Sequence, residues 1–382
     1  MIRTALLATL VTRTALVPIG LVALAILGHA LDTDLPPPGD LAYLPLRWDA
    51  VSYLEIARGG YPWAIPGDGN SLLVFFPAFP LILRGFAGLL RLPNEPVVWL
   101  WAGVALSTAF FCAALAYVYA LTNLMTHERS GTLAVWLIAC YPFSLFQGQV
   151  YTESLFLLAA VAACYHCHQR QFVAAFAFGC LVGLTRPTGI LVAVILAAMG
   201  WQFIRRRELE DTWAKARLVA AVLSPAVGTL AYSAYLYVLT GHWLFWVTGQ
   251  AGWGREITNP IDVVWTLART VADRGVGSYL LDRPYELARP FDVVYLAVAA
   301  CAVGLVWPVV RRFGWGMGAF VFLSIAVPFV VGGLTSIGRF TCVLFPLFMW
   351  LSTRSWALPL TIAFAVLQVI FAALFYTHRH IF

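Results

Sequence analysis

Apolar runs long enough to cross a lipid bilayer recur along this chain. A membrane-spanning helix needs about 20 consecutive, mostly apolar residues. Long candidates lie at 14–31, 97–124, 131–149, 151–168, 216–239, 291–310, 315–333 and 355–377, and shorter ones at 72–92, 172–185, 187–204 and 340–353. The pattern predicts an all-α polytopic membrane protein whose helices cross the bilayer roughly ten times. We expect a single transmembrane domain over residues 1–382.

The composition excludes a water-soluble fold of this size. Of the 382 residues, 61% are hydrophobic and 11% are charged, whereas a soluble domain is about 25% charged. The 15 Trp and 15 Tyr residues suit the aromatic belts at bilayer interfaces. Lys215 is the only lysine, and this preference for arginine is typical of a GC-rich bacterial genome. We therefore expect a multi-pass protein of a bacterial plasma membrane.

The positive charges indicate the orientation of the chain. The net charge of +6 is concentrated in short clusters such as Arg205–Arg207 and Arg311–Arg312. Such clusters favour the cytoplasmic side of a membrane. A nucleic-acid-binding surface would need a continuous basic stripe, and the sequence has none, so we expect no nucleic acid partner.

Two polar segments interrupt the apolar runs. Residues 32–71 hold six of the 18 carboxylates and follow a basic N-terminus, which predicts the first extracytoplasmic loop. Residues 241–290 form a second polar region, rich in Trp, Arg, Asp and Gly. The run 72–92 contains two prolines and could enter the membrane without crossing it. Residues 172–204 could form one long helix or two shorter ones.

The strongest local signal is RWDAVSYLEIARGGY at 47–61. Helical spacing puts Trp48, Val51 and Leu54 on one face, which predicts a short amphipathic helix at the membrane interface. Asp49 would begin this helix. Its carboxylate could act as a general base, or it could simply complement the helix dipole.

Charged residues next to apolar runs give two further signals. Glu153 begins such a run, directly after Tyr151 and Thr152, and a carboxylate at the mouth of a membrane helix is a functional candidate. Arg186 and Arg339 lie among apolar residues. A buried guanidinium needs an anion, either a phosphate or the carboxylate of Glu153.

Cysteine chemistry and cofactors are not indicated. Cys164 and Cys167 form a C-x-x-C beside two histidines, but a zinc site normally needs four ligands. We interpret the cysteines as small core residues. No metal site or cofactor is predicted, although the sequence leaves open whether a divalent cation takes part.

Several blocks together resemble a known family. The run at 47–61, FFPAFPL at 75–81, YPFSLFQGQVYTESLFLL at 141–158, GLTRPTG at 183–189 and SIGRFTCVLFPLF at 336–348 resemble the mannosyltransferases that add the second mannose of GPI anchors, and their bacterial relatives. The resemblance implies a GT-C-type transmembrane bundle with amphipathic helices in the first extracytoplasmic loop. It also implies a polyprenyl-phosphate sugar donor, usually mannose, used at the extracytoplasmic face.

The resemblance assigns roles to particular residues. The essential acid of the first large loop corresponds to Asp49, the expected catalytic residue. The matched blocks supply the expected substrate-binding residues, which are Arg47, Trp48, Glu55, Tyr151, Glu153, Arg186 and Arg339. The acceptor could be a glycolipid, a glycan or a protein, and membrane lipid is the remaining expected partner.

Two other functions stay open at this point. A transporter or lipid flippase could use a central Glu153–Arg186 pair inside the membrane. A non-catalytic lipid-binding scaffold could keep the same fold. Neither requires an acidic amphipathic segment after the first helix, which favours the transferase.

Overall fold

The computed structural model describes residues 1–29, 41–62, 71–126, 130–255, 257–275 and 291–379. Within these ranges the chain forms α-helices and short 3-10 helices and no β-strand, so the predicted all-α class is confirmed. Parts of the two polar segments, at 32–40, 63–70, 256 and 276–290, lie outside the described residues.

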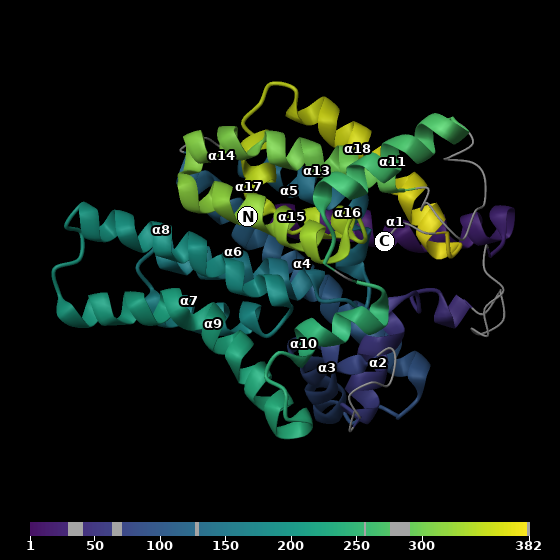
Figure 1. Ribbon diagram of the computed structural model, residues 1–382, viewed down its shortest axis with the longest axis horizontal. Coiled ribbons are helices and arrows are strands. Elements are labelled where there is room, and N and C mark those ends of the chain that lie inside the picture. Colours follow the sequence, from purple (N-terminus) through teal and green to yellow (C-terminus); the bar gives the residue numbers. More distant parts are fainter. Residues whose placement is uncertain (30–40, 63–70, 127–129, 256, 276–290, 380–382) are drawn as a thin grey trace.

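The first half of the chain contains the segment around Asp49 and the long helices that support it (Figure 1). Its elements are α1 (Ile2–Leu27), η1 (Leu41–Tyr43), α2 (Asp49–Gly59), η2 (Leu72–Val74), α3 (Ala78–Leu89), α4 (Pro96–Thr126), α5 (Gly131–Cys140), η3 (Pro142–Gly148), α6 (Glu153–His168) and α7 (Phe172–Gly183).

The second half completes the bundle. Its elements are η4 (Pro187–Leu191), α8 (Val192–Arg205), α9 (Thr212–Thr240), α10 (Phe245–Thr248), η5 (Gly249–Trp253), α11 (Pro260–Arg274), α13 (Asp292–Gly304), α14 (Val306–Phe313), α15 (Trp315–Gly332), α16 (Ile337–Thr341), α17 (Phe345–Leu351) and α18 (Ala357–Tyr376).

Fewer helices are long enough to cross a membrane than the apolar runs predict. The described residues contain seven helices of sufficient length and hydropathy, or eight if the bent pair α5–η3 counts as one span. The run 72–92 forms α3 and the run 172–185 forms α7, each of 12 residues. A helix of this length is about 18 Å long, shorter than the bilayer core of about 30 Å. The run 172–204 is thus two helices, which settles the alternative.

Helix α6 lies at the centre of the bundle. Twelve of its 16 residues are buried, and it packs against α4 and α7. A helix that is apolar on all sides is either buried in a protein core or surrounded by lipid, and α6 is covered mainly by its neighbouring helices. The surrounding helices therefore fix both ends of α6, including Glu153 at its start.

Glycines bring α7 and α9 unusually close together. A Cβ atom added to Gly183 would lie 2.0 Å from the carbonyl oxygen of Pro225, and one added to Gly228 would lie 2.1 Å from that of Cys180. Small residues at such crossings allow two backbones to approach within the membrane. This contact holds the end of α7, just before Arg186.

The apolar run 131–149 is broken by an 85° bend between α5 and η3. The bend frees backbone carbonyls that would otherwise lack donors. Arg13 of α1 donates to the carbonyl oxygens of Ala139, at 3.0 Å, and of Ser144. Gln368 of α18 donates to those of Ala139 and Tyr141. Two polar side chains from opposite ends of the sequence thus supply hydrogen-bond donors to the free carbonyl groups at the bend.

The basic clusters gather at one end of the bundle. The connection after α8, with Arg205–Arg207, lies beside the α14–α15 connection, because a Cβ on Gly314 would lie 3.3 Å from Gln202 Nε2. Arg170, just beyond the end of α6, pairs with Glu208 at the same place. Since α6 has 16 residues, its start at Glu153 lies about 24 Å away.

Candidate active site

Asp49 is the first residue of α2, and an unusual backbone conformation precedes it. Trp48 has φ 52°, in the left-handed region that favours glycine. A non-glycine residue there costs on the order of 1–3 kcal/mol, and such strain is concentrated at functional sites. The Asp49 side chain is 23% exposed. It therefore reaches both the interior of the bundle and solvent.

Arg339 occupies a similar position on the short helix α16. Ser336, the residue before this helix, also has a left-handed backbone, with φ 65°. The Arg339 side chain is 9% exposed and points to Asp49. The two short helices that carry the facing charges thus both begin at a strained non-glycine residue.

Glu153 and Arg186 come from breaks in the long helices. Glu153 begins α6, and its side chain is 1% exposed. Arg186 has an extended backbone and directly precedes Pro187, where η4 begins. Proline disfavours a helical conformation in the residue before it, so the chain turns at Arg186 and its side chain points inward to Glu153.

These four side chains form an alternating chain of charges. Arg339 Nη1 lies 2.5 Å from Asp49 Oδ2, and Arg339 Nε lies 3.1 Å from Glu153 Oε1. The same Glu153 oxygen lies 2.6 Å from Arg186 Nη2. Burial alone would lower the pKa of Arg339, but the carboxylates of Asp49 and Glu153 raise it above its ordinary value. Of the two anions expected for the arginines, the carboxylate of Glu153 contacts both guanidiniums, and Asp49 supplies a second carboxylate to Arg339.

Arg186 has hydrogen-bonding capacity that the protein does not use. Its Nη2 donates to Thr152 Oγ1 at 2.7 Å. Among the described residues, its buried Nε and Nη1 atoms have no hydrogen-bond partner. Leaving a buried charged donor unsatisfied is costly. Such free N–H groups in a cluster that opens to solvent at Asp49 are suited to an anionic ligand.

Tyr151 supports the cluster from one side. Its hydroxyl donates to the Arg47 carbonyl oxygen at 3.0 Å, and its ring lies 5.4 Å from the Arg339 guanidinium carbon. Burial, with a smaller contribution from Asp49, raises the pKa of Tyr151 well above its ordinary value. The hydroxyl therefore stays protonated and holds the segment before Asp49 in place.

Arg47 and Trp48 lie next to the cluster but face other groups. The Arg47 guanidinium donates to the carbonyl oxygens of Tyr376, Tyr43 and Leu46. The Trp48 ring packs edge-on against His378 at 5.6 Å. Through these contacts both residues hold the backbone at the start of α2 in place. A direct role in substrate binding stays a prediction for each.

The structure does not bring Glu55 to the cluster. Glu55 lies on an exposed face of α2, whereas the buried face of this helix is formed by residues such as Tyr53 and Ile56. Glu55 thus lies outside the charged cluster, and its expected contact with substrate stays a prediction.

Sequence reasoning missed two residues around the arginines. The Phe340 ring lies between three guanidinium groups, at 5.9 Å from Arg186, 5.6 Å from Arg339 and 5.9 Å from Arg255. Arg255 also donates to Ser336 Oγ at 3.3 Å. Phe340 directly follows the candidate residue Arg339, so its position in the sequence could have indicated it. Arg255 lies in an irregular polar segment with no distinctive pattern.

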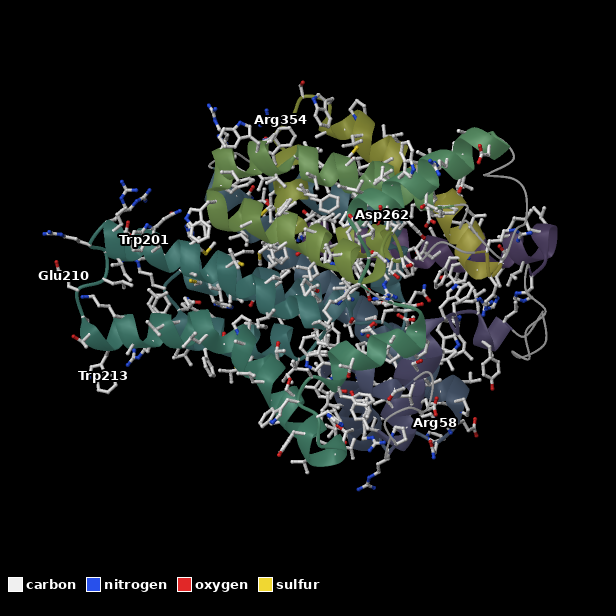
Figure 2. All side chains as sticks on the ribbon, viewed as in Figure 1. Arg58, Trp201, Glu210, Trp213, Asp262 and Arg354 are labelled. Carbon is white, nitrogen blue, oxygen red and sulfur yellow. The ribbon has the colours of Figure 1, made fainter. Side chains whose placement is uncertain are left out.

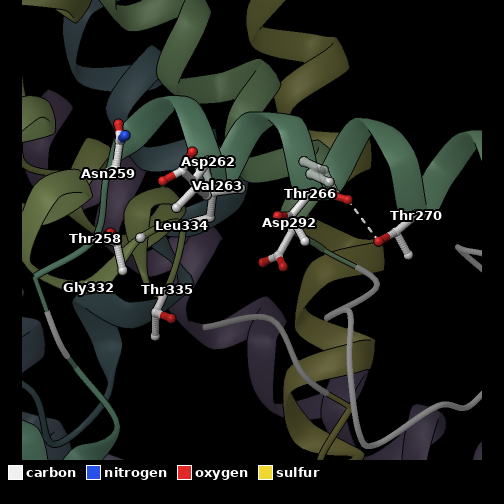
Figure 3. Close-up of a pocket in the computed structure, with 12 residues that line it drawn as sticks. Thr258, Asn259, Asp262, Val263, Thr266, Thr270, Asp292, Gly332, Leu334 and Thr335 are labelled. Carbon is white, nitrogen blue, oxygen red and sulfur yellow. Dashed lines mark hydrogen bonds between the residues drawn. The ribbon is translucent and has the colours of Figure 1, made fainter.

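A polar crevice lies a few residues along the chain from Arg339. It has a volume of about 470 Å³ and is formed by α11, the start of α13 and the segment after α15. Figure 3 shows Asp262 and Thr266 on α11 facing this space, with Asp292 and Thr335 nearby. Thr335 is four residues before Arg339, so their Cα atoms are at most about 14 Å apart.

No metal centre is evident in the part of the chain that the structure describes. It contains no group of three or more His, Cys, Asp or Glu side chains that could hold an ion. Cys164 and Cys167 are buried in the core, and His166 bonds Tyr117 and Gln171 instead.

Comparison with known proteins identifies the family. The model of the mannosyltransferase (PIG-V) family matches residues 41–251, which include Asp49, Glu153 and Arg186. The chain belongs to this family. The resemblance based on its sequence blocks is thereby confirmed. No curated protein matches the chain.

Solved structures of the Archaeoglobus fulgidus oligosaccharyltransferase are similar to the chain at low identity. The apo form matches with a TM-score of 0.48 and 13% identity, covering 97% of this chain and 56% of that one. The complex with Zn and sulfate matches at 0.42 and 14%, over 95% and 53%. The form tethered to an acceptor peptide matches at 0.42 and 12%, over 97% and 55%. The chain spans about half the length of these structures.

Proposed function

We propose that this protein transfers mannose from a polyprenyl-phosphate donor to an acceptor hydroxyl at the extracytoplasmic face of a bacterial plasma membrane. Membership of the mannosyltransferase family supports the reaction class. The single observation that carries the proposal is the charge chain from partly exposed Asp49 to buried Arg186. It provides a base next to a site for an anion.

Asp49 is the proposed general base. Its carboxylate is the only member of the charge chain with a substantial exposed fraction, 23%. An acceptor hydroxyl arriving from solvent can reach it, whereas Glu153 is enclosed. Arg339 fixes the orientation of the Asp49 carboxylate through Oδ2.

Arg186 is the proposed ligand of the donor phosphate, with Arg339 assisting. The unused Nε and Nη1 atoms of Arg186 can donate two hydrogen bonds to phosphate oxygens. A lipid-linked donor suits this position, because Arg186 lies at a break between membrane helices and a polyprenyl tail could extend between them. Glu153 holds both guanidiniums in place through its Oε1 atom.

The proposed reaction is a single displacement with inversion. The acceptor O–H gives its proton to Asp49, while the oxygen forms a bond to the anomeric carbon of mannose. The bond from that carbon to the phosphate oxygen breaks, and the polyprenyl phosphate leaves with its additional negative charge. The cationic Arg186 and Arg339 stabilise this charge as it develops. The step needs no cofactor, and a cation could still assist the phosphate.

The crevice below α11 is the proposed entry for the acceptor. Its walls carry threonine, asparagine and aspartate side chains, among them Asp262 and Thr266 (Figure 3). Such groups can hydrogen-bond a hydroxyl-bearing molecule from several directions. The short link to Arg339 keeps this site near Asp49.

The proposed side of the membrane follows from the charge distribution. Arg205–Arg207 and Arg311–Arg312 gather at one end of the bundle, and positive clusters favour the cytoplasm. Figure 1 places α2 and α16 towards the other end of the molecule. The charge chain should therefore open to the extracytoplasmic face. A transporter or flippase using the Glu153–Arg186 pair is the alternative, but it gives Asp49 no role.

The test is the substitution Asp49→Asn, with Glu55→Gln as the matched control on the same helix. Asparagine keeps the size of aspartate, and its side-chain oxygen can still accept a hydrogen bond from Arg339, but it is no base at neutral pH. General-base assistance typically contributes about 10²–10⁴-fold, so kcat should fall by that factor. Glu55→Gln should lose far less activity, because Glu55 lies outside the charge chain. Near-normal turnover by Asp49→Asn would remove Asp49 from the mechanism.

A further inference from the structure

A second cavity lies at the basic end of the bundle, away from the charge chain. It has a volume of about 610 Å³ and lies between the first turn of α7, the α8–α9 connection and the start of α9. Two arginines, Arg170 and Arg217, line it together with apolar side chains such as Val173, Ala177 and Leu209. The cavity thus combines cationic and apolar walls.

The two arginines differ in whether a carboxylate is paired with the guanidinium. Arg170 Nη2 lies 2.5 Å from Glu208 Oε2, so this guanidinium already has a carboxylate partner. Arg217 forms no hydrogen bond or ion pair with any residue that the structure describes. The described lining of the cavity contains no carboxylate. Arg217 is therefore available to an anion that enters the cavity.

The surroundings place the cavity at a membrane interface. Trp201 and Trp213 are 60% and 73% exposed, and Figure 2 shows both at the α8–α9 end of the molecule, on either side of Glu210. Exposed tryptophans favour the headgroup level of a bilayer. Arg205–Arg207 lie in the same connection and indicate the cytoplasmic side, where anionic lipids are enriched.

We propose that this cavity binds the headgroup of an anionic phospholipid from the cytoplasmic leaflet. The lipid phosphate would accept hydrogen bonds from Arg217 and Arg170. The glycerol and the start of an acyl chain would contact the apolar wall formed by Val173 and Ala177, of which Val173 is 71% exposed. Basic pockets between membrane helices on this side are suited to such headgroups. The site is independent of mannose transfer.

The apolar wall distinguishes a lipid from a free anion. Inorganic phosphate could satisfy the arginines but would leave the apolar part of the cavity in contact with water. A phospholipid covers both parts at once, because its phosphate and acyl chains lie at adjacent depths of the bilayer. The ligand of this cavity is therefore a phospholipid rather than a soluble phosphate.

The experiment measures how lipids stabilise the purified full-length protein in detergent. The unfolding temperature is followed while phosphatidylglycerol, phosphatidylcholine or inorganic phosphate is added. Phosphatidylglycerol should raise it saturably, and the other two should not. Arg217→Gln should weaken phosphatidylglycerol binding by about tenfold, the value of one charge-assisted hydrogen bond. Lys215→Gln, an exposed basic residue two positions away that does not line the cavity, should bind normally.

A second variant tests the cavity itself. Ala174→Phe would fill part of the space while keeping both arginines, and it should reduce binding to a similar degree. Equal losses in Arg217→Gln and Lys215→Gln would show diffuse surface attraction and overturn the proposal. Stabilisation by inorganic phosphate to the same extent would also overturn it, in favour of a simple anion site. Because Arg217 is exposed, its variant should fold even if Ala174→Phe does not.

Discussion

Glu153 is the residue on which the arrangement of the charge chain depends most. Its side chain is 1% exposed, and one of its oxygens contacts two guanidiniums, at 2.6 Å from Arg186 and 3.1 Å from Arg339. The substitution Glu153→Gln keeps the shape but removes the charge. Arg339 would retain the carboxylate of Asp49, whereas Arg186 would lose the one carboxylate that it contacts among the described residues and keep the neutral hydroxyl of Thr152.

The cost of this substitution can be estimated from buried ion pairs. Removing one partner of such a pair typically destabilises a protein by about 3–5 kcal/mol, because a charge is left buried without compensation. Glu153→Gln should therefore lower the free energy of unfolding by about this amount. The exposed Glu55→Gln control should stay within about 0.5 kcal/mol of the wild type.

The assay is denaturant-induced unfolding of the purified protein in mixed micelles, followed by tryptophan fluorescence. The double variant Glu153→Gln with Arg186→Gln should recover part of the loss, since the orphaned charge is then also removed. This recovery is a coupling energy between contacting residues. A cost below about 1 kcal/mol for Glu153→Gln, or no recovery in the double variant, would refute the reasoning.

Three further predictions concern single residues. Arg186→Ala should raise the KM for the lipid donor by about 10–100-fold through lost charge-assisted contacts, measured by varying donor concentration; an unchanged KM would count against the phosphate site. Asp262→Asn should raise the KM for the acceptor and leave that for the donor unchanged, and the opposite result would remove the crevice from acceptor binding. Burial, with smaller contributions from Arg47 and His29, lowers the pKa of His378 to about 3. The unfolded chain therefore binds the extra proton first, so stability should fall as the pH drops from about 6.5 towards 3, and His378→Asn should flatten this slope in thermal unfolding.

Much of the fold could be predicted from the sequence because a membrane helix is encoded locally. Runs such as 97–124 and 216–239 correspond closely to α4 and α9. The number of crossings was harder to predict, since apolar character does not distinguish a spanning helix from a short one. The run 131–149 appeared continuous, yet it bends at Pro142, and the donors that stabilise the bend come from distant helices.

The candidate site was predictable in its members but not in its geometry. Glu153, Arg186 and Arg339 stood out as charges beside apolar runs, and Asp49 stood out in an amphipathic segment. The structure joins the four residues across up to 290 positions of sequence. The motif around Glu55 did not show that this side chain lies on an exposed face of α2, because an acid in a recognised motif does not reveal which face of the helix it occupies. Arg255 was missed since only the folded chain brings it to Phe340.

The most direct test of the account is mannose transfer by the purified protein in lipid nanodiscs. Polyprenyl-phosphate mannose and nucleotide-linked mannose, both radiolabelled, would be offered separately, with membranes from the native host lacking the gene as the source of acceptor. The account predicts label in the acceptor from the lipid-linked donor alone, and none with Asp49→Asn. Transfer from the nucleotide donor, or equal transfer by Asp49→Asn, would contradict it.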